Sequence, residues 1–208
     1  LSSNYGIVKY NSERNTMIVY NQKDGIISNE FNDNANLVLD SHKFYLGGTL
    51  GVTYFDSDRI AVNGYSPQVL LTDFKVKNKP VYVNDDMDIL KKSITYTKSL
   101  TLSYDKANIS ISFSIPNFVN STNNQYAYRL VGLENNWTTT SNTEATFTIQ
   151  NSGTYIFEVK GANNDGVWNT TPTTLEIIVK PAPWKSWWAM CIYVLLIWLS
   201  LYGLVWII

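Results

Sequence analysis

The stretch Ile109-Ser110-Ile111-Ser112-Phe113-Ser114-Ile115 decides the fold, because apolar and hydroxyl side chains alternate along it without a break. A period of two places the four apolar residues on one face of a β-strand and the three serines on the other. Such a pattern is typical of a strand whose sheet is packed against a core on one side only. We therefore expect residues 109–115 to form a core strand of an antiparallel β domain.

Six further segments between residues 67 and 181 show the same alternation of apolar and polar side chains. They cover residues 70–76, 100–104, 126–130, 145–149, 155–159 and 175–179. Turns rich in Gly, Asn and Ser separate them, and seven short strands with such turns are typical of a β-sandwich. The sequence therefore predicts a sandwich of the fibronectin type III or immunoglobulin kind over residues 67–181.

Tyrosines have expected places in this sandwich. Tyr126 and Tyr128 share one strand face, which makes them core residues, while Arg129, the residue after Tyr128, points to the opposite face. The segment Gly153-Thr154-Tyr155 opens a strand, where the hydroxyl of a tyrosine corner would tie the strand to a loop. We expect Tyr155 to serve as that corner.

Residues 1–62 contain a faint internal repeat. The segment that runs from Leu1 through Gly6 to Tyr10 aligns with the one from Leu46 through Gly51 to Phe55 at an offset of 45 residues. Four-stranded propeller blades repeat at roughly 40–45 residues. One blade and a fraction cannot close a propeller, so these residues are expected to end a propeller whose other blades lie before Leu1.

The last part of the chain has the composition of a membrane segment. No charged residue follows Lys185, and residues 189–208 form an uncharged, largely apolar run. A helix of twenty such residues spans about 30 Å, the thickness of the hydrocarbon core of a bilayer. Before it lie Pro181, Pro183 and three tryptophans, which suit the headgroup layer. A single transmembrane helix is therefore expected over residues 187–208, the alternative being a buried core helix.

Overall composition excludes several functions. The chain of 208 residues has 16 basic and 17 acidic side chains, a balance that gives no electrostatic basis for binding nucleic acid. One cysteine excludes a disulfide framework and a cysteine-ligated zinc site. One histidine excludes metal sites that need several imidazoles and disfavours triad chemistry. We assign no catalytic, cofactor-binding or metal-binding residue, and the ligand-binding residues stay unknown.

Three polar groups suggest binding chemistry, and each has a simpler structural interpretation. Asp85-Asp86-Met87-Asp88 lacks the glycine and distal glutamate of a calcium loop, which favours a solvated turn. Asn163-Asn164-Asp165-Gly166 resembles a fragment of such a loop, but it is also a sequence for a tight hairpin turn with positive φ. His42 follows Asp40 in a polar loop, where an exposed side chain is expected.

Trp137, Trp168 and Tyr155 allow two interpretations. Aromatic rings with polar neighbours can stack on the face of a sugar. At the strand ends of a small sandwich, however, aromatic residues more often belong to the core and its corners. The core interpretation is favoured for all three residues.

Two parts of the chain resemble domains of one bacterial family. Tyr20-Asn-Gln-Lys-Asp24-Gly25-Ile-Ile-Ser-Asn-Glu-Phe31-Asn32, with Phe44-Tyr-Leu-Gly-Gly-Thr-Leu-Gly51-Val52, resembles the closing blade of a regulator propeller. Tyr126-Ala-Tyr128-Arg129-Leu-Val-Gly-Leu133 with Trp137, and residues 153–169, resemble the three-tyrosine Y_Y_Y domain. The Pro-Ala-Pro-Trp-Lys-Ser-Trp-Trp-Ala junction at residues 181–189 is similar to that family as well. The whole chain thus resembles the periplasmic sensor region of propeller-type two-component regulators.

The resemblance implies an all-β sensor segment without an active site of its own. Residues 1–62 would end the propeller, 67–181 would form the Y_Y_Y sandwich, and 187–208 would cross the bacterial inner membrane once, with 1–186 in the periplasm. Such a segment relays ligand binding to a cytoplasmic histidine kinase, often a hybrid with a response regulator, or to a diguanylate cyclase. Gut members of the family respond to oligosaccharides, which are bound mainly by other propeller blades.

A homodimer is expected, because the rotation or tilt of one helix needs a second helix as its reference. Two other classes of protein remain open. A membrane-anchored binding or spacer module would have no cytoplasmic output and would end soon after Ile208. A carbohydrate-active enzyme would carry its catalytic carboxylates in blades before Leu1.

Overall fold

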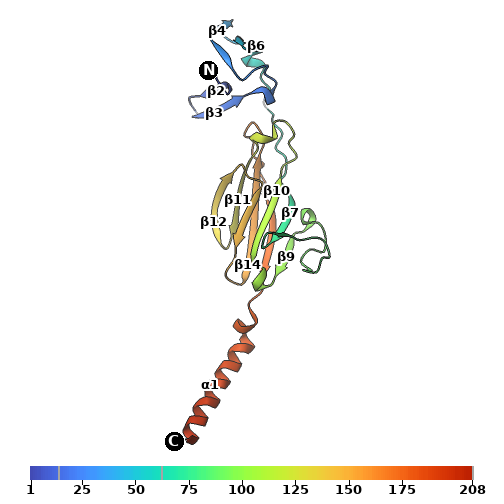
Figure 1. Ribbon diagram of the computed structural model, residues 1–208, viewed down its shortest axis with the longest axis vertical. Coiled ribbons are helices and arrows are strands. Elements are labelled where there is room, and N and C mark those ends of the chain that lie inside the picture. The colour runs from blue at the N-terminus through green and yellow to red at the C-terminus, as the bar shows by residue number, and fades with distance from the viewer. Residues whose placement is uncertain (14, 62, 208) are drawn as a thin grey trace. The chain divides into compact units, whose positions relative to one another are not determined.

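The computed structural model describes residues 1–13, 15–61 and 63–207, without the side chains of residues 16, 201 and 204–207 (Figure 1). The chain forms two compact units. The first comprises Leu1–Pro67 together with two loops, Asn117–Asn124 and Ala162–Trp168. The second comprises Gln68–Pro116, Gln125–Gly161 and Asn169–Ile208. Strands make up most of the regular structure, in agreement with the expected all-β fold.

The first unit contains two antiparallel three-stranded sheets, with the order β1-β2-β3 in one and β4-β5-β6 in the other. Short 3-10 turns, η1 (Gln22–Asp24) and η2 (Ser57–Arg59), follow the last strand of each sheet. The strands are β1 (Ser2–Ser3), β2 (Gly6–Asn11), β3 (Thr16–Tyr20), β4 (Phe31–Leu39), β5 (Lys43–Gly48) and β6 (Gly51–Asp56).

The internal repeat of the sequence relates the β1–β2 hairpin of one sheet to the β5–β6 hairpin of the other. Gly6 begins β2 and Gly51 begins β6, with φ of 127° and 132°. Glycine reaches such backbone angles at no steric cost. At Gly6 a side chain is also excluded by space, because a Cβ there would lie 2.0 Å from the carbonyl oxygen of Tyr20. Each glycine follows a tight turn from the preceding strand, as expected for two copies of one hairpin.

The second unit is a β-sandwich of a four-stranded sheet, β13-β10-β7-β8, and a five-stranded sheet, β12-β11-β14-β15-β9. All seven expected strands are present, and β15 and β9 pair in parallel. The observed ends differ from the expected ones at Tyr104, which begins the 3-10 turn η4 (Tyr104–Lys106), and at Ile115 and Ile149, which lie one residue beyond their strands. The strands are β7 (Leu70–Val76), β8 (Lys79–Pro80), β9 (Ser99–Leu102), β10 (Asn108–Ser114), β11 (Gln125–Val131), β12 (Glu134–Thr140), β13 (Glu144–Thr148), β14 (Gly153–Ala162) and β15 (Thr173–Val179).

One hydrophobic core lies between the two sheets of the sandwich. Phe113 of β10 and Phe157 of β14 are fully buried, and their ring centroids are 6.1 Å apart. Phe147 packs edge-on against Phe157 at 5.8 Å, and Tyr126 lies 5.2 Å from Phe113. Burial of large aromatic rings contributes strongly to the stability of such a core. The alternating pattern of β10 thus places its apolar residues where the sequence predicted them.

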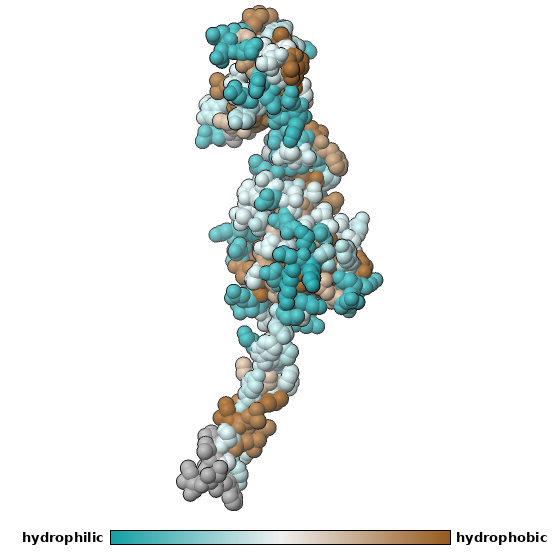
Figure 2. All heavy atoms as spheres, viewed as in Figure 1, coloured by the Kyte–Doolittle hydropathy of each residue, from teal (hydrophilic) through white to brown (hydrophobic). Residues whose placement is uncertain are grey.

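The chain ends in η6 (Pro183–Lys185) and a helix, α1 (Trp187–Ile207). Trp184 packs edge-on against Tyr104 with ring centroids 4.8 Å apart, and the amide of Met190 donates to the carbonyl of Ser186. Apolar side chains gather on the surface of α1 (Figure 2).

Within the part of the chain that the structure describes, no helix is both long and apolar enough to cross a bilayer. The transmembrane helix expected over residues 187–208 is therefore not found there. That expected span includes residue 208 and the side chains of residues 201 and 204–207, all of which lie outside the described part.

Candidate functional site

Residues 60, 61 and 63–67, which we call the segment 60–67, follow η2 without regular secondary structure, and hydrogen bonds from two loops of the first unit hold Asn63 and Tyr65. One loop, residues 117–124, connects β10 to β11, and the other, residues 162–168, connects β14 to β15. Most of these bonds come from asparagine side chains. We call Asn63, Asn117, Asn124, Asn163, Asn164 and Asp165 the asparagine cluster.

Asn163 is the most deeply buried member of the asparagine cluster, with none of its surface exposed. Its Nδ2 donates to the backbone carbonyls of Asn63 at 2.6 Å and Tyr65 at 2.7 Å. Its Oδ1 accepts from the amides of Asp165 and Val167, both at 3.0 Å. One side chain therefore closes its own hairpin turn and also holds the segment 60–67.

Asn63 makes the complementary contacts from the segment side. Its amide donates to Oδ2 of Asp165 at 2.6 Å, and its Nδ2 donates to Oδ1 of Asn164 at 3.2 Å and of Asn117 at 3.4 Å. Its own Oδ1 accepts from the amide of Tyr65 at 3.1 Å. Every donor and acceptor of the Asn63 side chain is thus engaged.

Asn117 joins the two loops to each other. It is 5% exposed, and its Nδ2 lies 2.8 Å from Oδ1 of Asn124 and 3.1 Å from Oδ1 of Asn164. A buried amide without partners would cost about 1–3 kcal/mol. Among the described residues, no buried side-chain nitrogen or oxygen lacks a partner. The asparagine cluster therefore holds its loops in one arrangement without an unsatisfied polar group.

A second set of contacts ties the 117–124 loop to η1. Nδ2 of Asn120 donates to Oδ1 of Asp24 at 2.7 Å, and Lys23 approaches Oγ1 of Thr122 at 3.4 Å. Asp24 is itself held, because its Oδ2 accepts from the amide of Asn21 in a capping box. The loop thus contacts the turn that follows the first sheet as well as the segment 60–67.

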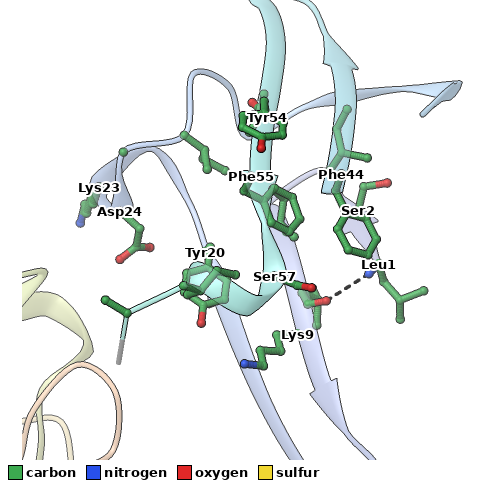
Figure 3. A pocket seen from close by; sticks show the side chains of 18 of the residues that line it. Leu1, Ser2, Lys9, Tyr20, Lys23, Asp24, Phe44, Tyr54, Phe55 and Ser57 are labelled. Atoms are coloured by element: carbon green, nitrogen blue, oxygen red, sulfur yellow. Dashed lines mark hydrogen bonds between the residues drawn. The ribbon is translucent and has the colours of Figure 1, made fainter. Parts of the chain in front are cut away.

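A hollow of about 1070 Å³ lies beside these contacts, between the two sheets of the first unit (Figure 3). The rings of Tyr20, Phe44 and Phe55 line it, together with Lys9 and Asp24. Burial raises the pKa of Tyr20 above its usual range, and the nearby carboxylates of Asp165 and Asp24 raise it further. Aromatic walls with a few charged groups are typical of surfaces that bind small molecules or other protein segments.

The structure agrees with the expectation for the acidic run 85–88 and differs from the expectation for His42. Asp85 accepts from the amides of Tyr82 and Met87 at 3.0 Å, as in the expected solvated turn. His42 is half-buried, which corrects the expected exposed side chain. Its ring lies with Asp56 and Asp58 in a group whose ligand atoms are within 4.8 Å of one another. The backbone pairing of β5 with β6 brings these distant residues together, and their sequence spacing carries no metal motif.

The aromatic residues of the sandwich divide into two groups. Tyr126 is buried and Tyr128 packs against the core, as predicted. Tyr155 is also buried, and its hydroxyl donates to the carbonyl of Asn151 at 2.9 Å, which agrees with the expected corner. Trp137 and Trp168 remain 36% and 37% exposed, so their expected placement in the core is wrong.

The ring of Trp137 lies outside the hydrophobic core and contacts two cationic side chains. The guanidinium carbon of Arg129 is 4.6 Å from the centroid of the Trp137 ring, and Nζ of Lys160 is 5.0 Å from it. Arg129 also pairs with Glu158 at 2.7 Å. Trp137 belongs to an exposed strand, β12, which lies at the edge of its sheet, and cation–π contacts stabilise an aromatic ring in such a position.

Comparison with known proteins shows which domain and which proteins this chain is similar to. Residues 117–180 match the model of the Y_Y_Y domain, and this range begins with the 117–124 loop and includes the 162–168 loop. The chain is 55% identical over 205 residues to Histidine kinase P4 of Formosa agariphila. The match covers 99% of this chain and 15% of that protein.

Two solved structures from B. thetaiotaomicron share the fold. The extracellular domain of the hybrid two-component system BT3049 matches with a TM-score of 0.66 at 23% identity, over 86% of this chain and 24% of that one. The extracellular domain of BT4673 matches with a TM-score of 0.54 at 24% identity, over 88% and 24%. The resemblance stated from the sequence, to the sensor region of two-component regulators with a Y_Y_Y domain, is thereby confirmed.

Proposed function

We propose that this chain is the juxtamembrane relay segment of a membrane-bound bacterial sensor, of the histidine kinase or hybrid histidine kinase type. Residues 1–62 would end a propeller, residues 67–181 would form the Y_Y_Y sandwich, and residues 187–208 would lead through the inner membrane. The sequence identity to a histidine kinase over nearly the whole chain favours this output over a diguanylate cyclase or an anchored spacer. Residues 1–186 would lie in the periplasm.

The observation that carries the proposal is the double attachment made by Asn163. Its side chain holds the carbonyls of Asn63 and Tyr65, and the loop to which it belongs is followed, after residues 169–172, by β15. Four hydrogen bonds join the segment 60–67 to this loop, two from Asn163 and one each to Asn164 and Asp165. A displacement of the segment would therefore have to move the loop or break these four bonds. Side chains that link two backbones in this way are suited to transmit motion.

The path from this loop to α1 is short and stiff. β15 ends at Val179, and Pro181 and Pro183 lead into η6 and then into α1 at Trp187. Proline restricts the backbone, so this connection would lose less motion than a glycine-rich linker of the same length. Force or rotation applied at β15 would thus reach the helix.

The signal itself is proposed to be a change in the arrangement of two chains in a homodimer. A ligand shifts the balance between two arrangements only by its difference in affinity for them. We propose that the ligand, a carbohydrate or another small molecule, is bound mainly by propeller blades other than those of this chain. The relay segment would then convert their movement into a new spacing or angle of the paired helices.

The variant Asn163→Ala tests this relay in the full-length protein. Cells would be exposed to a panel of oligosaccharides, and phosphorylation of the sensor would be measured for the wild type, for Asn163→Ala and for Asn123→Ala. Asn123 lies in the 117–124 loop, is exposed, and makes no side-chain hydrogen bond to any described residue of the segment 60–67. We expect the first variant to lose the ligand-dependent change and the control to retain it. A wild-type response in Asn163→Ala would contradict the proposed relay.

A further inference from the structure

Asn63 is followed by Gly64, and the sequence contains no second Asn-Gly pair. This pair has a characteristic reaction, because the amide nitrogen of glycine can attack the side-chain carbon Cγ of the preceding asparagine. A C–N bond forms, the side-chain nitrogen leaves as ammonia, and a five-membered succinimide results. Water then opens the ring to aspartate or isoaspartate. One water is consumed and one ammonia released, with no oxidation or reduction.

The local environment of Gly64 does not obstruct this attack. Gly64 is exposed, and a Cβ placed on it would meet no atom within 4 Å. The side chain of Asn63 already folds back along its own backbone, since its Oδ1 accepts from the amide of Tyr65. The reacting carbon therefore lies close to the backbone that contains the attacking nitrogen.

The asparagine cluster opposes the same reaction because it holds both the backbone of Asn63 and its side-chain nitrogen. Any rotation about ψ of Asn63 during ring closure would displace the backbone carbonyl oxygen that Asn163 holds at 2.6 Å. The amide of Asn63 is held as well, at 2.6 Å from Asp165. The leaving nitrogen, Nδ2, donates to Asn164 and Asn117. Closure thus demands that the cluster open first.

We propose that Asn63 is a deamidation site and that the asparagine cluster is the lock that controls it. Reaction proceeds from the open cluster, whose population is set by the free energy of local opening. The product carries a carboxylate where Nδ2 faced two amide oxygens, next to the carboxylate of Asp165. It cannot donate to Asn117 or Asn164, so the two hydrogen bonds from this side chain are lost permanently. The chemistry of the lock does not depend on the relay proposed above.

The test is peptide mapping of the whole chain by mass spectrometry after incubation in warm, mildly alkaline buffer. Deamidation at Asn63 would be timed in the native protein and in concentrated urea. We expect it to be slower by about tenfold or more in the native protein, as for a backbone protected by local structure. Equal rates would overturn the lock, and no reaction at Asn63 in urea would overturn the site.

Two variants separate the lock from the chemistry. Asn163→Ala frees the carbonyl of Asn63 and should bring the native rate towards the rate in urea. Gly64→Ala should slow the reaction in both conditions, because its methyl group hinders ring closure but fits the open space at this position. A native rate unchanged by Asn163→Ala would overturn the lock, even if that variant had lost its signalling response. Conversely, an accelerated rate with normal signalling would support the lock and contradict the relay.

Discussion

Tyr155 shows how one side chain fixes the entry of a strand into the sandwich. Its ring is buried, and its hydroxyl donates to the carbonyl of Asn151 in the preceding loop. Gly132 makes room for the ring, because a Cβ there would lie 3.0 Å from Cδ1 of Tyr155. The φ of Gly132 is also positive, at 99°, so two independent constraints favour glycine at that position.

The substitution Tyr155→Phe removes this hydroxyl and keeps the ring. We expect the free energy of unfolding to fall by about 1 kcal/mol, the usual net contribution of one hydrogen bond, with the carbonyl of Asn151 left unpaired. Urea denaturation of the chain measures the change. Tyr96→Phe is the matched control, because Tyr96 is 73% exposed. If both variants unfold at the same urea concentration, the corner contributes nothing to stability.

At this scale the sequence predicted side chains that follow a periodic pattern and missed those defined by distant partners. Tyr126 and Tyr128 were predicted because a strand alternates its faces, and both contact the core. The turn at residues 163–166 was also predicted. The role of Asn163 was not, because its partners lie about 100 residues away in the chain. Asparagine is so abundant in this sequence that composition gives no signal for one buried residue.

At the scale of elements, a polar contact crosses the outer face of the four-stranded sheet. Lys75 of β7 reaches Oε2 of Glu144 in β13 at 2.5 Å, passing over β10 between them. Ser112 of β10 donates to the same carboxylate at 3.2 Å. The hydrogen bond from Lys75 lowers the pKa of Glu144 below its usual range, and the carboxylate raises the pKa of Lys75.

This contact makes stability depend on pH in a predictable direction. The pKa of Glu144 is lower in the folded chain than in the unfolded chain, where it is about 4.3. Its contribution is therefore present above the unfolded pKa and is lost as the pH falls through the folded pKa. We expect Glu144→Gln to lose less stability on acidification than the wild type, as measured by urea unfolding from neutral to acidic pH.

The exposed Glu134→Gln in β12 provides the control for this measurement, since it lies outside the contact with Lys75. Both partners of the pair are partly exposed, so the effect should shrink as salt is added. A pH profile of Glu144→Gln that coincides with the wild-type profile would show that the pair does not contribute.

The elements that the sequence missed are those without a buried face. β12, with the sequence Glu134-Asn-Asn-Trp-Thr-Thr-Thr140, is exposed along nearly its whole length and lies at an edge of its sheet. An edge strand needs no hydrophobic alternation, because one partner and solvent satisfy it. β8 has only two residues, too few for any pattern. The seven other strands of the sandwich each bury one face, and the period of two identified them.

At the scale of the whole molecule, the proposed relay depends on a stiff connection after the sandwich. Inserting a flexible Gly/Ser segment after Lys180 should separate the helix from β15 and abolish the ligand-dependent change in phosphorylation of the full-length sensor. The same segment inserted between Ser141 and Asn142, in the exposed turn after β12, should leave the response intact. An unchanged response to the insertion after Lys180 would contradict mechanical transmission.

The order of a propeller-like region, a sandwich and a terminal helix could be predicted, because each has its own composition and period. The two compact units are not continuous in sequence, because the 117–124 and 162–168 loops lie within the sandwich sequence but belong to the first unit. Side-chain hydrogen bonds cause this departure. They join loops that hydrophobic periodicity does not describe, so no sequence pattern indicated which segments would associate.

The position of β15 has a mechanical consequence. Residues 173–179 pair with β14 on one side, and residues 176–179 pair with β9 on the other, so the strand that leads to α1 is not at an edge. A pull along this strand would load both ladders in shear, and many hydrogen bonds would have to fail together. At a sheet edge peeled sideways, they would break one at a time. A sandwich attached through such a strand can bear tension without unravelling.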